Sequence, residues 1–401
     1  MISQPIDSKR AGLRNERLIL RILRERGALS QTELCGMTGL GSSTASSIVS
    51  RLREKGLILE SEGQSTKRGP KPVILEINPR SRFIVGVEIN PDVVMIGLFD
   101  FTTELIDTIK IGLDKDHQVE QAMEQLTINL LGLFDRHDVK QEQILGIGIA
   151  LSGTISSDGQ VVLSSPMGWK NVPLLERLSR RLECPVRLYS TRVRLLAEMA
   201  MESNGSFRNV LYVNVADGVG CSTTIDGQLL QGATGRSGEM GHIVVDPSGP
   251  QCGCGHKGCL EAFISGPALA KRILDDRATE PSSWLKDNIS PEDNHKTIIK
   301  KWGEALHRND AYALTLCQAV SDYLGKAVAM AVNLYDPELV ILAGYVCQAC
   351  GGYIQPALAQ SIEQMVYNSD SRRIAIRPAA VGDQSIVIGT AMAIWQQEVG
   401  V

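Results

Sequence analysis

No segment of this 401-residue chain is apolar over the roughly 20 residues that a transmembrane helix requires. The first residues, Met-Ile-Ser-Gln-Pro-Ile-Asp, are polar and lack the apolar stretch of a secretory signal peptide. These two absences exclude a membrane-spanning protein and argue against a secreted one. We therefore expect a cytoplasmic protein with no membrane partner.

The chain also lacks the cysteine pattern of a disulfide framework. Its 9 cysteines are an odd number, and three of them fall in one short window while the others are scattered. This distribution is typical of a protein kept in a reducing cytosol. Cys347 and Cys350 have the spacing of a redox pair, but they lie in a glycine-rich turn, and we interpret them as free thiols.

A strong net charge is missing as well, because 41 basic and 45 acidic side chains give only −4. The charge is unevenly distributed, however. Residues 1–80 hold 14 basic and 8 acidic side chains, a balance of +6, whereas the remainder has a balance of −10. A basic head on an acidic body predicts that only the head meets a polyanion.

The head shows the pattern of a winged helix-turn-helix. Hydrophobic periodicity, capping residues and glycine stops predict three helices (15–26, a short one capped by Ser30, and one to Lys55 capped by Ser42-Ser43) and two strands (57–60 and 73–77). This order of helices followed by a two-stranded wing is that of a DNA-binding module. The alternative is a small helical module that binds protein.

The third helix has two contrasting faces. Its apolar stripe is Ala45, Ile48, Val49 and Leu52. The opposite face carries small hydroxyls and one guanidinium, which suit base edges and phosphates in a major groove: Ser42, Ser43, Thr44, Ser46, Ser47 and Arg51. The tip between the two strands is basic, with Lys67, Arg68 and Lys71. We predict that these nine side chains contact double-stranded DNA.

The body of the chain repeats one pattern. Strands are predicted at 83–89, 93–99, 105–111, 144–151 and 186–189, and a similar series begins again with 210–215, 221–225 and 339–343. This repetition predicts two similar α/β lobes. We expect three domains: a head (1–80), a small lobe (81–195, with a C-terminal helix 390–401) and a large lobe (196–389).

The cysteine window predicts a metal site. Cys252, Cys254 and Cys259 are accompanied by His242 and His256, and three thiolates with one imidazole form a tetrahedral zinc set. Either histidine fits as the fourth ligand on spacing alone. Four protein ligands close the coordination shell, so we expect structural zinc. The carboxylates of Glu239 and Glu261 flank the window, and a zinc staple does not need them.

The same window resembles the signature of the ROK family (repressors, open reading frames and sugar kinases). The resembling segments are Gly235–His242, Cys252–Glu261, Asn333–Glu338 and Ile147–Gly153. The resemblance implies an α/β, actin-like and ribonuclease H-like two-lobed sugar-kinase fold behind the winged head, and a homodimer or dimer of dimers. It also implies His242 as the fourth zinc ligand, and a sugar pocket lined by Gly153, Glu239, His242 and Glu261.

The chain departs from the family's kinases where phosphate is transferred. The first turn, Glu88–Asp92, has no glycine, and Pro91 removes a backbone donor. Ser190 stands at the position of the catalytic aspartate, and a neutral hydroxyl does not accept the sugar proton. Asp217 in the second turn repels phosphate, and the nucleotide-side glycines are reduced to Gly344. We predict no catalytic residue and no enzyme.

Arg192 lies beside Ser190, where the kinases hold sugar hydroxyls. A cation there favours an acidic or phosphorylated sugar derivative as ligand. The alternative is a decayed pocket in which Arg192 pairs with a carboxylate such as Glu239. Both interpretations remain open.

These observations predict a transcriptional regulator, a repressor of carbohydrate-related genes that binds a palindromic operator as a dimer. Its kinase-like but inactive lobes would sense a sugar or sugar derivative. One alternative is an active sugar kinase with a DNA-binding head. Another is a regulator controlled by a protein partner without a small ligand.

Overall fold

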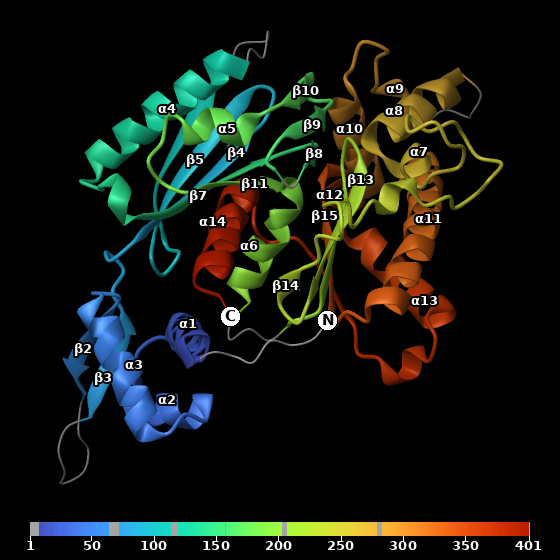
Figure 1. Cartoon of the computed structure of the whole chain (residues 1–401). Coiled ribbons are helices and arrows are strands. Elements are labelled where there is room, and N and C mark those ends of the chain that lie inside the picture. Colours follow the sequence, from blue (N-terminus) through green and yellow to red (C-terminus); the bar gives the residue numbers. More distant parts are fainter. Residues whose placement is uncertain are drawn as a thin grey trace. The chain divides into compact units, whose positions relative to one another are not determined.

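The structure is a computed structural model that describes residues 8–63, 72–113, 119–156, 158–202, 207–278 and 283–400. The chain divides into two compact units (Figure 1). The first comprises Met1–Ser206 with Asp383–Val401, and the second Phe207–Gly382. Each unit contains its own five-stranded sheet.

The first unit begins with the three-helix head. Its elements are α1 (Ser8–Arg26), β1 (Leu29–Ser30), α2 (Gln31–Thr38), α3 (Ser42–Glu54), β2 (Ile58–Glu62) and β3 (Val73–Ile77), with the strands in the order β1-β3-β2. Ser30 caps α2 as predicted, because its hydroxyl accepts from the amide of Glu33 while the Glu33 carboxylate accepts from the amide of Ser30. The predicted cap of α3 is wrong: Gly41 holds the extended N-cap conformation, and Ser42 is already helical.

The large sheet of the first unit has the order β11-β7-β4-β5-β6. Its strands are β4 (Phe83–Ile89), β5 (Val93–Asp100), β6 (Leu105–Gly112), β7 (Ile144–Leu151) and β11 (Val186–Ser190). β4, β5 and β6 form an antiparallel meander, whereas β7 and β11 run parallel to β4. A small second sheet, β10-β9-β8, consists of β8 (Thr154–Ile155), β9 (Val161–Ser164) and β10 (Trp169–Val172).

Helices cover both faces of the large sheet (Figure 1). α4 (Val119–Arg136) and α5 (Leu174–Ser179) lie on one face, and α6 (Arg194–Met201) with α14 (Ser385–Glu398) lies on the other. Side chains alternate along β4, so that Val85 packs toward α4 and Ile84 toward α14. Gly86 lets α14 approach the sheet, since a Cβ there would lie 2.1 Å from the carbonyl oxygen of Val387.

The second unit repeats this plan. Its sheet, β14-β13-β12-β15-β16, comprises β12 (Val210–Val215), β13 (Val219–Ile225), β14 (Gln228–Leu229), β15 (Leu339–Ala343) and β16 (Ala375–Pro378). β12 and β13 are antiparallel, and β15 and β16 continue parallel to β12. A hairpin extended by parallel strands therefore occurs in both units, which confirms the predicted pair of similar α/β lobes.

One apolar cluster joins β12 and β15 to the helices of the second unit. These helices are α7 (Glu261–Ile264), α8 (Gly266–Asp275), α9 (Trp284–Asp287), α10 (His295–His307), α11 (Ala311–Tyr335), α12 (Tyr345–Cys350) and α13 (Ile354–Met365). Cys347 and Cys350 are buried here, and none of the nine cysteines forms a disulfide. None of the described helices is both long and apolar enough to cross a membrane.

Candidate nucleic-acid interface and metal centre

The predicted DNA-contacting side chains of α3 share one exposed face. Ala45, Ile48, Val49 and Leu52 are all at most 5% exposed and pack inside the head. Ser42, Ser43, Thr44, Ser46 and Ser47 are exposed, and Arg51 is half-buried. The amphipathic pattern that buries one side of α3 thus presents the hydroxyl-rich side to solvent.

Arg51 is held by a residue that the sequence did not single out. The Nε atom of Arg51 lies 2.8 Å from Oε1 of Glu16, and the Nζ atom of Lys55 lies 2.6 Å from Oε2 of the same carboxylate. Arg51 also donates to the hydroxyl of Ser47 at 2.9 Å. Glu16 is 8% exposed. Burial raises its pKa, but the bonds from Lys55 and Arg51 outweigh this effect and leave the pKa lowered.

The basic tip cannot be placed in the same way. Lys67, Arg68 and Lys71 lie outside the described residues. The flanking strands β2 and β3 are paired antiparallel as far as Glu62 and Val73. The DNA contacts predicted for the tip stay predictions.

Four side chains of the predicted metal site lie together in the second unit. The ligand atoms of His242, Cys252, Cys254 and Cys259 are all within 4.8 Å of one another. The sulfurs of Cys254 and Cys259 are 3.6 Å apart, and Nδ1 of His242 is 3.8 Å from the sulfur of Cys252. A zinc tetrahedron with Zn–S bonds of about 2.3 Å has sulfur–sulfur separations of about 3.8 Å. The donor set therefore fits a tetrahedral ion.

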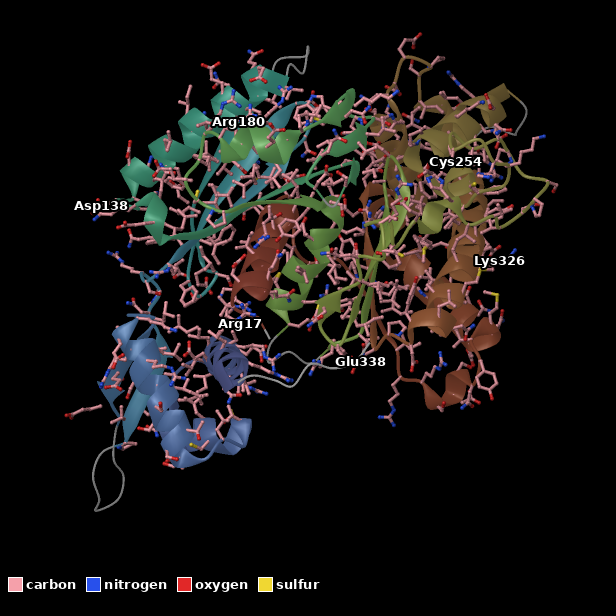
Figure 2. The ribbon with its side chains drawn as sticks, viewed as in Figure 1. Arg17, Asp138, Arg180, Cys254, Lys326 and Glu338 are labelled. Atoms are coloured by element: carbon pink, nitrogen blue, oxygen red, sulfur yellow. The ribbon has the colours of Figure 1, made fainter. Side chains whose placement is uncertain are left out.

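The loop that carries these ligands requires a tight backbone. Gly258 has φ +74°, and a Cβ there would lie 1.6 Å from the carbonyl oxygen of Asp246. The amide of Cys252 donates to the carbonyl of His256 at 2.8 Å, and isolated β-bridges join Val244 to Cys259 and Gln251 to Lys257. Figure 2 marks Cys254 on this loop, where its side chain is exposed.

The pKa values of two thiols in the site are shifted in opposite directions. Hydrogen bonds from the backbone and then the ring of His256 lower the pKa of Cys254 to about 6. Burial, followed by the bonds and charges of neighbouring thiols, raises the pKa of Cys259 to about 12. A divalent cation would stabilise the thiolates and relieve the repulsion between their negative charges. Nδ1 of His256 lies 3.4 Å from the sulfur of Cys254, yet His242 belongs to the four-residue cluster.

The flanking carboxylates have different environments. Glu261 begins α7, and its Oε2 accepts from the amide of Val219 at 2.9 Å. This bond ties the metal loop to the turn between β12 and β13. Glu239 precedes the short 3₁₀ turn that carries His242, and its side chain is exposed. Both carboxylates thus flank the loop that presents the metal ligands.

The remaining predicted pocket residues belong to the first unit. Ser190 ends β11, and its hydroxyl accepts from Nε of Arg192 at 3.1 Å. Gly153 follows β7, and a Cβ there would lie 2.5 Å from the carbonyl oxygen of Leu163. The alternative in which Arg192 pairs with Glu239 stays a prediction.

The first kinase turn is filled by its own side chains. Asn90 donates to Oε1 of Glu88 at 2.7 Å, and Glu88 is 7% exposed. Burial raises the pKa of Glu88, although the bond from Asn90 and the charge of Arg194 oppose this rise. An amide–carboxylate pair occupies a turn that in a kinase would offer free backbone donors to phosphate.

The corresponding turn of the second unit is occupied by a side-chain network around Asp217. Tyr345 donates to Oδ1 of Asp217 at 2.8 Å, Nε2 of His295 lies 2.7 Å from the same oxygen, and Nζ of Lys296 lies 3.9 Å from Oδ2. Burial raises the pKa of Asp217, but the bonds from Tyr345 and His295 outweigh it, so the pKa is lowered. Asp217 follows β12 and Tyr345 follows the parallel strand β15.

Ligands of α/β proteins bind at such carboxyl ends of parallel strands. Here the exposed carboxylate of Asp217 already takes the position where an anion would be attracted. A Cβ on Gly266 would lie 1.9 Å from the hydroxyl of Tyr345, so the tyrosine ring packs directly against this glycine. A carboxylate at this position would repel the phosphates of a nucleotide.

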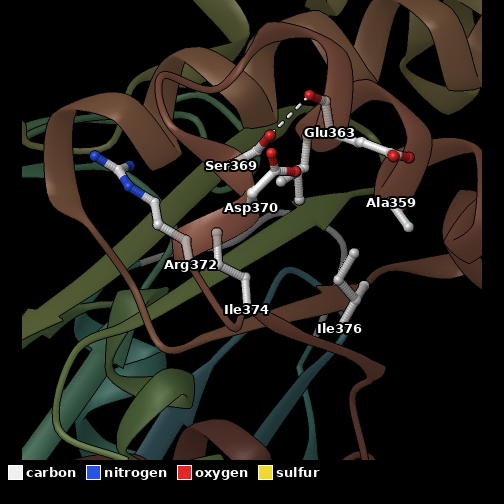
Figure 3. A pocket seen from close by; sticks show the side chains of 8 residues that line it. Ala359, Glu363, Ser369, Asp370, Arg372, Ile374 and Ile376 are labelled. Atoms are coloured by element: carbon white, nitrogen blue, oxygen red, sulfur yellow. Dashed lines mark hydrogen bonds between the residues drawn. The ribbon is translucent and has the colours of Figure 1, made fainter.

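A cavity of about 290 Å³ lies elsewhere in the second unit, beside α13 and β16 (Figure 3). It is lined by Ala359, Ile362, Glu363, Ser369, Asp370, Arg372, Ile374 and Ile376. None of the predicted metal, sugar or DNA residues contributes to it. We assign it no part in the site.

A winged head joined to two lobes of sugar-kinase type, with filled phosphate turns, defines the class as a DNA-binding regulator built on a kinase fold. A model of the ROK family matches residues 84–398, and a model of winged helix-turn-helix DNA-binding domains matches residues 13–58. The chain therefore belongs to the ROK family. This confirms the predicted family and fold.

The relatives include regulators of similar length. The xylose repressor of Bacillus subtilis is 26% identical over 95% of this chain and 94% of its own length. The DNA-binding transcriptional dual regulator NagC of Escherichia coli is 26% identical over 84% of this chain and 81% of its own length. These matches agree with the predicted DNA-binding transcriptional regulator.

Solved structures show the same fold. A ROK family transcriptional regulator, a homolog of the Escherichia coli MLC protein, has a TM-score of 0.83 at 23% identity and covers 97% of both chains. The ROK hexokinase of Thermus thermophilus has a TM-score of 0.66 at 23% identity and covers 79% of this chain and 98% of its own. The regulator structure thus matches nearly the whole chain, and the hexokinase matches a smaller part.

Proposed function

We propose that this protein is a cytoplasmic repressor that binds a palindromic operator and regulates genes of carbohydrate use. The observation that supports this most is the combination of an exposed hydroxyl-rich α3 face with the Asp217 network in the kinase turn. The head presents hydroxyl groups that would contact DNA. In the lobes, Asp217 and Ser190 stand where phosphate transfer would need a phosphate-binding turn and a general base. The repressor relatives support the same proposal.

The DNA contacts would be made by α3 and the basic tip. Ser42, Ser43, Thr44, Ser46 and Ser47 would face base edges, and Arg51 the phosphates. Lys67, Arg68 and Lys71 would neutralise the adjacent backbone. Two such heads in a homodimer, or in a dimer of dimers, would read the two halves of the operator.

The effector would be a sugar or a sugar derivative. The side chains of Glu239, Glu261 and His242, together with the backbone at Gly153, would form hydrogen bonds with the hydroxyl groups of the sugar. Arg192 adds a cation that favours an acidic or phosphorylated derivative. Ser190 cannot deprotonate a hydroxyl, so the ligand would be bound without being converted.

Zinc would be structural. The ion would be held by His242, Cys252, Cys254 and Cys259. It would cross-link the loop between β14 and α7. Because Glu261 follows Cys259 closely and accepts from the amide of Val219, ordering this loop would also order the proposed sugar contacts.

The direct test is a mobility shift with the protein's own upstream DNA, titrated with pentoses, hexoses, amino sugars and their phosphates. We expect nanomolar binding that one ligand class weakens or strengthens. Failure to bind that DNA at low salt would reject the proposal. Specific DNA binding with no response to any sugar would favour a protein partner as the regulator.

A further inference from the structure

The DNA-binding head and α14 pack against each other within the first unit. Both elements belong to the first unit, and their apolar residues form one cluster that includes Ile19 and Leu20 of α1 with Phe99, Trp395 and Val399. Trp395 is 1% exposed and donates its indole N–H to the carbonyl of Phe101 at 3.1 Å. The head is therefore seated on the lobe by packed side chains.

Arg24, in the last turn of α1, occupies this junction. Its guanidinium carbon lies 4.6 Å from the centroid of the Trp395 ring. Nη2 lies 3.2 Å from the sulfur of Met392, and Nε donates to the hydroxyl of Thr103 at 3.3 Å. Within the described part of the chain, Arg24 has no carboxylate at ion-pair distance. Burial lowers the pKa of Arg24 to about 10.

The contacts of Arg24 depend on the position of α14, because Trp395 and Met392 belong to that helix. This half-buried guanidinium feels the charges of Glu25 and Glu104 at longer range, and its direct contacts are the π face of the indole and two weak acceptors. Displacing α14 would remove the contacts with Trp395 and Met392 together, whereas Thr103 lies in the turn between β5 and β6 and would stay. Loss of the cation–π and sulfur contacts would then disfavour the seated position of the head.

Closer to its N-terminus, α14 touches the turn that contains Arg192, a residue of the proposed sugar site. Gly389 lies against the turn Thr191–Val193, and a Cβ there would lie 2.0 Å from the carbonyl oxygen of Val193. This turn follows Ser190 and contains Arg192. Backbone-to-backbone packing leaves no compressible side chain between the turn and the helix.

On the head side, α1 also holds the recognition helix. Glu16 of α1 binds Arg51 and Lys55 of α3. Three successive contacts thus join the turn beside Arg192 to the DNA-facing helix, through Gly389, Arg24 and Glu16.

We propose that Arg24, seated on Trp395 and Met392, is the positioning residue that couples α14 to the orientation of the DNA-binding head. The proposal rests on the proposed function, since it concerns how DNA binding is regulated. Arg24 does not contact DNA in this account. It determines whether a change at the Thr191–Val193 turn alters operator affinity.

The test is a double-mutant cycle on the full chain, using fluorescence anisotropy with its upstream DNA. Gly389→Ala forces α14 away from Val193, and we expect it to change the operator Kd at least threefold. In an Arg24→Ala background the same substitution should change the Kd by less than about 1.5-fold. Arg24→Lys keeps the charge but not the planar stack, and should restore only part of the coupling. Arg26→Ala, an exposed arginine of the same helix, is the matched control and should leave the threefold effect intact.

Hydrogen exchange provides a readout that does not depend on the Gly389→Ala variant folding. DNA binding should slow exchange across residues 385–398 in the wild-type and Arg26→Ala proteins, and not in Arg24→Ala. Equal DNA-induced protection in all three proteins, or additive effects in the cycle, would overturn the coupling role. If the wild-type protein does not bind its upstream DNA, the proposed function itself has failed, and this outcome is separate from the other two.

Discussion

Glu16 and Arg51 form an ion pair of 2.8 Å that fastens α1 to the recognition helix α3. Lys55 joins the same carboxylate at 2.6 Å. The head therefore uses a nearly buried acid to hold two cations of the helix predicted to meet DNA. Arg51 has its orientation set before it reaches a phosphate, which reduces the entropy that binding must overcome.

The Glu16 pair predicts an acid-sensitive head. The folded-state pKa of Glu16 lies below its ordinary value of 4.5, so its stabilisation is complete above pH 4.5 and is lost as pH falls through the folded pKa. Glu16→Gln should lower the free energy of unfolding by about 1–2 kcal/mol at pH 7 and less at pH 3. Thermal unfolding across this range measures the effect. A loss that stays constant from pH 7 to pH 3 would contradict the assignment.

Arg51→Ala should weaken operator binding about tenfold, or about 1.4 kcal/mol, and reduce the slope of log K against log salt by about 1. Arg53 lies on the same helix and pairs with Glu60 at 3.0 Å, so Arg53→Ala is the matched control. Anisotropy at several salt concentrations separates the two variants. An unchanged salt slope in Arg51→Ala would count against a phosphate contact.

The metal site predicts one zinc ion for each chain. Cys259→Ser should release the ion and destabilise the second unit by more than about 4 kcal/mol, because the loop loses its cross-link. Elemental analysis and thermal unfolding with and without chelator provide the measurement. Cys35→Ser, a half-buried thiol in α2, should retain the metal. Full zinc content in Cys259→Ser would refute the ligand assignment.

The Asp217 network predicts that the chain does not turn over ATP. A coupled ADP-release assay with hexoses and amino sugars should give no sugar-dependent rate above background, since the phosphate turn is filled and Ser190 is not a base. Ser190→Asp alone should not restore turnover, because Asp217 and Tyr345 remain. Sugar-dependent turnover at ordinary kinase rates in the wild-type protein would contradict this account.

Local patterns predicted the buried strands well. β4, β7, β12 and β15 have the predicted bounds, because each is a short apolar run that ends at a turn residue. α14 begins at Ser385, five residues before the predicted start at 390. The predicted helix begins just after Gly389, whereas Gly389 is itself helical and accommodates the carbonyl of Val193.

Contacts between distant residues were not predictable from one sequence. Glu16 meets residues 35 and 39 positions away, and Asp217 meets Tyr345 across 128 positions. Only tertiary packing brings such partners together. A weak signal existed for Glu16, which lies three positions before Ile19 on the buried face of α1. The cysteine window was predictable because its ligands are close in the chain.

In the proposed function, a ligand in the lobes controls DNA binding by the head. The most direct measurement is operator Kd, by anisotropy, in the wild-type and Arg192→Ala proteins with and without saturating sugar or sugar phosphate. We expect one ligand class to change the wild-type Kd at least tenfold, and Arg192→Ala to remove this response while its ligand-free Kd stays within about twofold. A ligand that binds the wild-type lobes tightly by calorimetry and leaves the operator Kd unchanged would contradict this expectation.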